Sequence, residues 1–245
     1  MKRRRTLYLA VGVFLLGIAT TAVGFYVRHR RQKELSVTAF SMSSTYQIFK
    51  VGVSKPLLNA RIKRLQRSDG TWKEMTTYYS ESGATEGQTT ILGITGRGVF
   101  KINDEKQRLF FLSPKYHAVH EVNAEQMRSS GQFVRDDVLL GYPVVVQRTP
   151  GGDGGFTEFF LAPSLGGTLL REMDRNRDGS FALIDADEIT LGEPTDADFG
   201  PVPNYVVDYT VYERFIRDAG TNGQVDLARK MQLVLDQQKS DAKSK

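Results

Sequence analysis

The residues best suited to chemistry in this sequence form a short acidic run in its last third. Asp174, Asn176 and Asp178 place oxygen-bearing side chains at its first, third and fifth positions, a glycine follows at the sixth, and Asp185 stands at the twelfth. Alternate oxygen ligands, a glycine for the sharp turn and a closing carboxylate are the pattern of a calcium loop of the EF-hand or dockerin type. The run therefore indicates a site for Ca²⁺ or another divalent cation.

The same run also fits a plain β-hairpin. The closing ligand is Asp185 rather than a glutamate, and Ala182 at the ninth position offers no side-chain oxygen. The flanks, residues 168–173 and 180–184, have the alternation of strands, so that residues 176–179 become a turn. The hairpin is the simpler interpretation, and cation binding by the four oxygen-bearing residues stays open as the alternative.

The other chemistry-bearing residues give weaker patterns. On a strand, His117 and His120 face opposite sides because they are three residues apart, which does not suit a shared metal. The glycine-rich run 151–155 lacks the helix start and the Lys-Ser/Thr pair of a phosphate-binding loop. Cysteine, a Gly-x-Ser-x-Gly elbow and a His-Glu-x-x-His pair are absent. We predict no enzymatic activity, and only scattered acidic residues such as Asp185 and Asp187 leave a hydrolase open.

Residues 6–27 form the one long stretch without a charge. A helix of 22 residues rises about 33 Å, enough to cross the hydrocarbon core of a bilayer. We predict a single transmembrane anchor in the inner (cell) membrane, with lipid contacts along residues 6–27. The basic residues that flank this stretch are Lys2, Arg3, Arg4 and Arg5 before it, and Arg28, Arg30, Arg31 and Lys33 after it.

Two alternatives to the anchor stay open. A cleaved signal peptide has a shorter apolar core, of about 7–15 residues, and a small-x-small site, which Thr20 and Ala22 supply. The Arg4-Arg5 pair fits a twin-arginine signal less well, because a very hydrophobic stretch follows it. The flanking charges are nearly balanced, so they alone do not decide the orientation; we expect the short N-terminus in the cytoplasm and the body outside, a preference that depends on the family resemblance given below.

Positive charge is concentrated at the N-terminus. Residues 1–33 hold eight of the 33 Lys and Arg residues and no acid, which leaves 25 basic and 28 acidic residues in the rest of the chain. A body with a net charge of −3 lacks the basic surface that nucleic-acid binding requires. We expect no nucleic-acid partner.

The central part of the chain has the pattern of an antiparallel sheet. Asp69-Gly70 separates two strand-like runs, 61–65 and 72–79, which is a strong hairpin signal. With these two runs the sequence predicts about nine strands in all, at a spacing of about 8–14 residues, which suits a meander or half-barrel rather than alternating strands and helices. Residues 138–147 have the pattern of one strand with Pro143 at an edge or bulge, and residues 123–128 that of one short helix.

The C-terminal region changes character. Leu227, Met231 and Leu235 lie on one face of an amphipathic helix predicted over 224–238. The predicted fold is therefore mainly β (α+β), a curved antiparallel meander or half-barrel with one or two C-terminal helices, preceded by a single transmembrane helix. Its predicted parts are a basic cytoplasmic n-region (1–5), the anchor (6–27), a basic juxtamembrane linker (28–44), the antiparallel β domain (45–200), and a Pro-rich connector with amphipathic helices and a polar tail (201–245).

One part of the β domain has a familiar order of elements. Leu140-Gly-Tyr-Pro-Val-Val-Val146 leads into a Gly-aromatic strand, then into a Pro-x-x-Gly corner at 163–166, and then into a hairpin with Asp178-Gly179. This order resembles the bacterial lipoprotein-carrier superfamily, which includes the LolA/LolB-type carriers and the RseB-like envelope-stress regulators. Ile189 to Pro194 and Asp198 to Pro203 resemble the closing strand and Pro-rich exit of such domains.

The resemblance implies a function as well as a fold. It implies an incompletely closed sheet wrapped over helices, whose apolar concave face holds acyl chains or protein tails. We therefore predict a membrane-anchored, non-catalytic protein with a periplasmic or otherwise extracytoplasmic β domain that binds an acyl ligand or another envelope protein. No cofactor is predicted, apart from the Ca²⁺ alternative, in which the Asp174–Asp185 loop makes the chain a cation-binding structural or interaction module.

Overall fold

The structure is a computed structural model, and it describes residues 37–53, 55–114, 122–151 and 154–243. The predicted anchor 6–27, the basic residues on both sides of it and the two histidines His117 and His120 lie outside these ranges. Within them, no helix combines the length and the apolar character needed to cross a membrane. Ser36–Lys245 form a unit of their own, and the description below concerns this unit.

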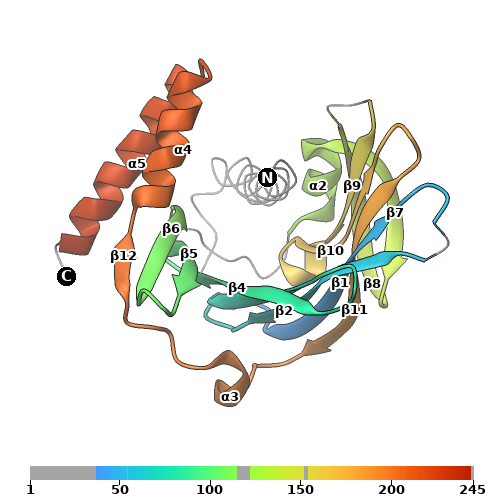
Figure 1. Ribbon diagram of the computed structural model, residues 1–245, viewed down its shortest axis with the longest axis horizontal. Helices are drawn as coiled ribbons and strands as arrows, with labels where there is room; N and C mark the ends of the chain where they lie inside the picture. The colour runs from blue at the N-terminus through green and yellow to red at the C-terminus, as the bar shows by residue number, and fades with distance from the viewer. Residues whose placement is uncertain (1–36, 54, 115–121, 152–153, 244–245) are drawn as a thin grey trace. The chain divides into compact units, whose positions relative to one another are not determined.

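Twelve strands form one open sheet in the described part of the chain, which confirms the prediction of a mainly β protein (Figure 1). The order across the sheet is β12-β6-β5-β4-β3-β2-β1-β11-β10-β9-β8-β7. All neighbours are antiparallel except β12 and β6, which are parallel. The strands are β1 Phe40–Phe49, β2 Leu57–Gln66, β3 Trp72–Tyr79, β4 Thr85–Ile94, β5 Gly98–Asn103, β6 Arg108–Ser113, β7 Gln132–Leu139, β8 Tyr142–Pro150, β9 Phe156–Ala162, β10 Thr168–Arg175, β11 Phe181–Leu191 and β12 Val206–Asp208.

Helices are short except at the C-terminus. Asn123 caps α2 by accepting hydrogen bonds from the backbone N–H groups of Glu125 and Gln126. The last two helices pack against each other, and Lys239 Nζ of the second lies 2.7 Å from Glu213 Oε1 of the first. The helices are α2 Ala124–Ser130, the 3₁₀ turn η1 Pro163–Leu165, α3 Asp196–Phe199, α4 Thr210–Thr221 and α5 Val225–Lys243.

The predicted hairpin at Asp69-Gly70 is confirmed, because β2 and β3 pair on either side of it. Asp69 Oδ1 accepts a hydrogen bond of 2.7 Å from the backbone N–H of Thr71. Gly70 has a φ of 83°, in the left-handed region that favours glycine. The turn therefore forms for the local reasons that its sequence indicates.

The prediction of one strand over 138–147 was wrong. The structure ends β7 at Leu139 and begins β8 at Tyr142, and Leu140 and Gly141 between them have φ values of 50° and 82°. Two positive φ angles define a type I′ turn, which usually has asparagine or aspartate at its first central position. Leucine at this position gives no turn signal in the sequence, because it lies within a run of apolar residues that has the pattern of a strand.

Strand β1 joins the two halves of the sheet. It pairs with β2 on one side and with β11 on the other, although β11 follows it by more than 130 residues. The strand begins at Phe40, inside the segment that the sequence suggested as a linker, and its side chains Phe40 and Met42 are buried. Such long-range pairing has no local signal in the sequence.

The register places different side chains on the two faces of the β2–β6 half. Leu65, Lys73, Leu92, Phe100 and Phe111 face one another across five neighbouring strands and therefore share one face, here called the outer face. Figure 1 shows α3 outside the curve of the sheet and α2 inside it. The buried helix residues that pack on the outer face are Phe199 of α3, Tyr212 of α4 and Leu235 of α5.

Candidate binding groove on the outer face

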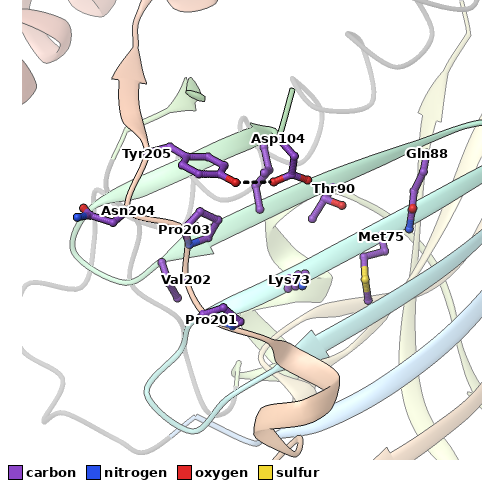
Figure 2. Close-up of a pocket in the computed structure, with 11 residues that line it drawn as sticks. Lys73, Met75, Gln88, Thr90, Asp104, Pro201, Val202, Pro203, Asn204 and Tyr205 are labelled. Carbon is purple, nitrogen blue, oxygen red and sulfur yellow. Dashed lines mark hydrogen bonds between the residues drawn. The ribbon is translucent and has the colours of Figure 1, made fainter. Parts of the chain in front are cut away.

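A groove of about 580 Å³ lies between the outer face and the segment that follows α3 (Figure 2). Its floor is made of side chains from β3, β4 and β5, and its wall is the extended segment Pro201–Tyr205, here called the connector. Hydrophobic and polar groups alternate along it. The lining residues are Lys73, Met75, Gln88, Thr90, Ile102, Asp104, Pro201, Val202, Pro203, Asn204 and Tyr205.

Two contacts anchor the connector over the sheet. At its start, Phe199 is buried against Leu65 and Leu92, and Lys73 Nζ donates a hydrogen bond of 2.8 Å to the Phe199 carbonyl. At its end, the Tyr205 hydroxyl donates to Asp104 Oδ1 at 3.1 Å, as Figure 2 shows. Between these points Pro201 and Pro203 hold φ near −65° and lack N–H donors, which favours an extended chain over a strand of the sheet.

A second groove, of about 450 Å³, continues from the first along the same floor. The two share Met75 and Gln88, and the second extends toward β1 and β11. Hydroxyl and charged side chains dominate it. Its lining residues are Ser41, Met42, Ser43, Ser44, Arg61, Ile62, Lys63, Met75, Thr77, Tyr79, Gln88, Asp187, Glu188 and Thr190.

Charges of both signs lie along the second groove. Thr45 Oγ1 donates to Asp187 Oδ1 at 3.3 Å, and Lys63 Nζ lies 3.1 Å from Asp198 Oδ1 of α3. Burial raises the pKa of the Asp187 carboxyl, while the Thr45 hydrogen bond and the charge of Arg61 act in the opposite direction. The lining of the two grooves includes no histidine or cysteine. Such a surface can hydrogen-bond and pack, but it offers no nucleophile paired with a base.

The structure distributes the four predicted cation ligands over a hairpin. Asp174 is the last residue but one of β10 and accepts from Thr157 Oγ1 at 3.0 Å, while Asn176 and Asp178 are both hydrogen-bonded to Ser180 in the turn. The Ser180 hydrogen bonds lower the pKa of the Asp178 carboxyl. These contacts are those of a β-turn between two strands.

Asp185 lies away from the other three. Arg171 donates to its two carboxylate oxygens at 2.8 and 2.7 Å, and Asp185 and Arg171 face each other across the β10–β11 pair. Asp174 is three residues from Arg171 along β10, so it projects from the opposite side of the sheet. Within the ranges that the structure describes, no three histidine, aspartate or glutamate residues are grouped to hold a metal ion. Calcium binding by this run stays a prediction.

Sequence analysis missed Glu172, which stands between these residues. Burial raises the pKa of its carboxyl to about 7, and the negative charge of Asp174 adds to the effect. Its Oε2 atom is buried and has no hydrogen-bond partner. Glu172 lines neither groove. The strand pattern of residues 168–173 gave no sign that this carboxylate is buried.

No protein-family model matches the chain. The search of curated protein sequences also found no match. Solved structures do match. A chain of the MucA/MucB complex of Pseudomonas aeruginosa is 15% identical with a TM-score of 0.39, and the match covers 69% of this chain and 57% of that one. This chain thus spans little more than half of the length of its MucB-complex counterpart.

Two further matches cover most of the other protein. A LolA superfamily protein from Nitrosomonas europaea is 13% identical with a TM-score of 0.32, over 69% of this chain and 93% of that one. LprF from Mycobacterium bovis is 12% identical with a TM-score of 0.29, over 67% and 90%. These matches assign no family, ligand or partner to this chain.

Proposed function

We propose that this chain is a non-catalytic binding protein of the cell envelope whose β domain holds an extended segment of another envelope protein. The observation that carries the proposal is the continuity of the two grooves on the outer face. They share Met75 and Gln88, and together they run from the connector to β1 and β11. An elongated, open surface of this kind suits an extended polypeptide better than a compact small molecule.

The lining of the grooves favours a polypeptide over an acyl chain. An acyl chain has no polar group to satisfy the hydroxyl, amide and charged side chains that line the second groove, and burying them unpaired is costly. A polypeptide has one N–H and one C=O at nearly every residue. By contrast, the apolar cluster that includes Phe40, Val146 and Phe160 is filled by its own side chains, each at most 1% exposed.

The proposal is non-catalytic because two of the three carboxylates that line the grooves, Asp104 and Asp187, have structural partners and the lining includes no histidine or cysteine. Asp104 accepts from Tyr205 and Asp187 accepts from Thr45. Glu172, whose raised pKa would suit a general acid, lies outside both grooves. The remaining parts of the proposal, a membrane anchor at residues 6–27 and a body outside the cytoplasm, are supported by the sequence.

A photo-crosslinking amino acid at Gln88 tests the proposal, because Gln88 is exposed and lines both grooves. The matched control is Lys101, which is exposed on a neighbouring strand and pairs with Ile91, on the other face. We expect irradiation of intact cells to give a polypeptide adduct from position 88 and none from position 101, as read by mass spectrometry. A lipid adduct from position 88 would instead support an acyl ligand, and equal adducts from both positions would contradict a groove-specific partner.

A further inference from the structure

The two edges of the sheet differ in how much pairing surface they offer. β12 is three residues long, whereas β7 has eight residues and pairs only with β8 among the strands of the sheet. An unpaired strand presents a row of free N–H and C=O groups to any strand that can lie beside it. The β7 edge is therefore the larger open pairing surface in the described part of the chain.

The turn after β7 fixes which backbone groups point outward. A two-residue turn joins Leu139 and Tyr142 by a backbone hydrogen bond, so alternate residues of β7, Asp137 and Arg135, also direct their N–H and C=O groups to β8. Asp136 and Val138 then direct theirs away from the sheet. The Val138 N–H bears this out, since its acceptor is the Asp137 carboxylate, at 2.8 Å, and not a group of β8.

Apolar side chains are also exposed along this edge. Phe133 is 41% exposed, Val138 is 61% exposed, and Leu140 in the following turn is 48% exposed. Between them lie three charged residues of both signs, Arg135, Asp136 and Asp137. A strand with apolar ends and a mixed-charge centre has the composition of a specific pairing edge rather than of a uniformly charged, protected one.

We propose that β7 pairs in antiparallel fashion with β7 of a second copy of this chain, about a two-fold axis through Asp136. An axis through a residue of β7 sets outward backbone groups against outward groups of the other copy, and the charges of the strand select Asp136 as that residue. This alignment sets Arg135 of each copy against Asp137 of the other, and the pairing ends near Val134, where the register of β7 shifts. A two-fold interface uses the same surface on both copies, so each favourable contact occurs twice.

The charged residues of β7 favour this alignment over the two alignments in which the axis is shifted by one residue. Shifting the axis by one residue toward the N-terminus sets Arg135 against Arg135, and shifting it toward the C-terminus sets Asp137 against Asp137. In the alignment on Asp136, the only like charges that meet are the two Asp136 carboxylates, and Arg128 Nε already donates to both oxygens of Asp136, at 3.0 and 3.2 Å. Opposite charges directly across a strand pair stabilise it, and like charges destabilise it.

The first test uses the absence of native cysteine. Residues on the axis of a hydrogen-bonded pair have Cα atoms about 5.5 Å apart, within the range of about 4.4–6.8 Å that a disulfide spans. We expect full-length Asp136→Cys, in detergent micelles under mild oxidation, to form a disulfide-linked dimer. The matched control, Val206→Cys, places a cysteine on the other edge strand at a residue that is 70% exposed. Equal cross-linking of the two variants would overturn the proposal.

A charge exchange tests the register without cysteine. Asp137→Arg sets arginine against arginine at both contacts, and we expect the dimer fraction measured by native mass spectrometry to fall about tenfold. Arg135→Asp combined with Asp137→Arg restores both opposite-charge contacts and should restore the dimer. Val138→Pro removes an outward N–H without touching the β7–β8 ladder and should leave a folded monomer. A wild-type chain that stays monomeric at all concentrations, or a dimer that the double variant fails to restore, would overturn the two-fold pairing.

Discussion

The two ends of the sheet differ in the helices that pack against them. At one end, β5, β6 and β12 are backed by two long helices through an aromatic cluster in which Phe111 contacts Phe100, Tyr209 and Tyr212. At the other end, β7, β8 and β9 are backed by the seven-residue α2 and the turn η1. The first end gains its stability from packing distant segments together. The second end leaves the edge strand β7 without a partner on its outer side, and binding through a strand edge requires such an unpaired edge. The first end is called the closed end below, and the second the open end.

The largest expected loss of stability comes from truncating a core phenylalanine, and one such residue can be tested at each end of the sheet. Phe111→Ala removes a fully buried ring from between the sheet and α4, and it should lower the free energy of unfolding by about 3–5 kcal/mol. Phe160→Ala at the other end removes a ring that is 1% exposed and should cost a similar amount. Hydrogen exchange should distinguish them: the first variant speeds exchange in α4 and α5, the second in β7–β10. Faster hydrogen exchange in the same segments in both variants would show that the two ends of the sheet do not unfold independently.

Glu172 gives the open end a dependence on pH. Since burial raises its folded-state pKa to about 7 from an ordinary value of 4.5, its contribution to stability is complete below pH 4.5 and is lost as the pH rises through 7. We expect Glu172→Gln to raise the free energy of unfolding at pH 8 by about 3 kcal/mol at most, and to change little at pH 4. Urea unfolding at the two pH values measures this difference.

The matched control is the other carboxylate of the same strand pair. Asp185→Asn removes an acceptor from Arg171 and should lower stability at pH 8, the opposite sign to Glu172→Gln. If the two variants change the free energy of unfolding equally at pH 8, ionisation of the buried Glu172 carboxyl does not destabilise the folded protein.

Helix α2, which backs β7 and β8, depends on its cap. Asn123→Ala removes the acceptor of two backbone N–H groups and should cost about 1 kcal/mol, within a range of about 0.5–2. Because Gln147 Nε2 donates to the carbonyl of Met127 in α2, exchange in β8 should rise with that in α2. Ser129→Ala, in the same helix but away from its cap, is the control and should change stability less. An equal loss of stability in both variants would contradict a specific contribution of the cap, since alanine has a higher helix propensity than either residue that it replaces.

Local signals predicted much of the sheet but not how its parts meet. The turn at Asp69-Gly70 and the helix capped by Asn123 have sequence signals that involve only neighbouring residues, and both are confirmed. The turn at Leu140-Gly141 was missed because an apolar residue adopts a positive φ there. The pairing of β1 with β11 was missed because it depends on burial of Phe40 and Met42 against residues more than a hundred positions away.

The grooves were less predictable than the fold. Met75 and Gln88 come from two strands whose polar and apolar side chains gave no sign of a common site. The wall of the first groove is a proline-rich segment, which indicates an extended chain but not its path across the sheet. The predicted cation ligands, by contrast, are close in sequence, and strand alternation separates Asp185 from Asp174.

The smallest expected effect concerns the connector at the closed end. Tyr205→Phe removes the hydrogen bond to Asp104, and because Tyr205 and Asp104 are bonded at the protein surface, global stability should fall by less than about 1 kcal/mol. Hydrogen exchange at residues 202–206 should nevertheless rise, since the end of the connector then loses its hydrogen bond to Asp104 and keeps the packing of its ring. Tyr209→Phe is the control, because the described residues give its hydroxyl no hydrogen bond and its ring stays on Phe111. If Tyr205→Phe leaves both exchange and the Gln88 crosslink unchanged, the Asp104 contact does not hold the wall of the groove, and Lys73 at Phe199 is its principal anchor.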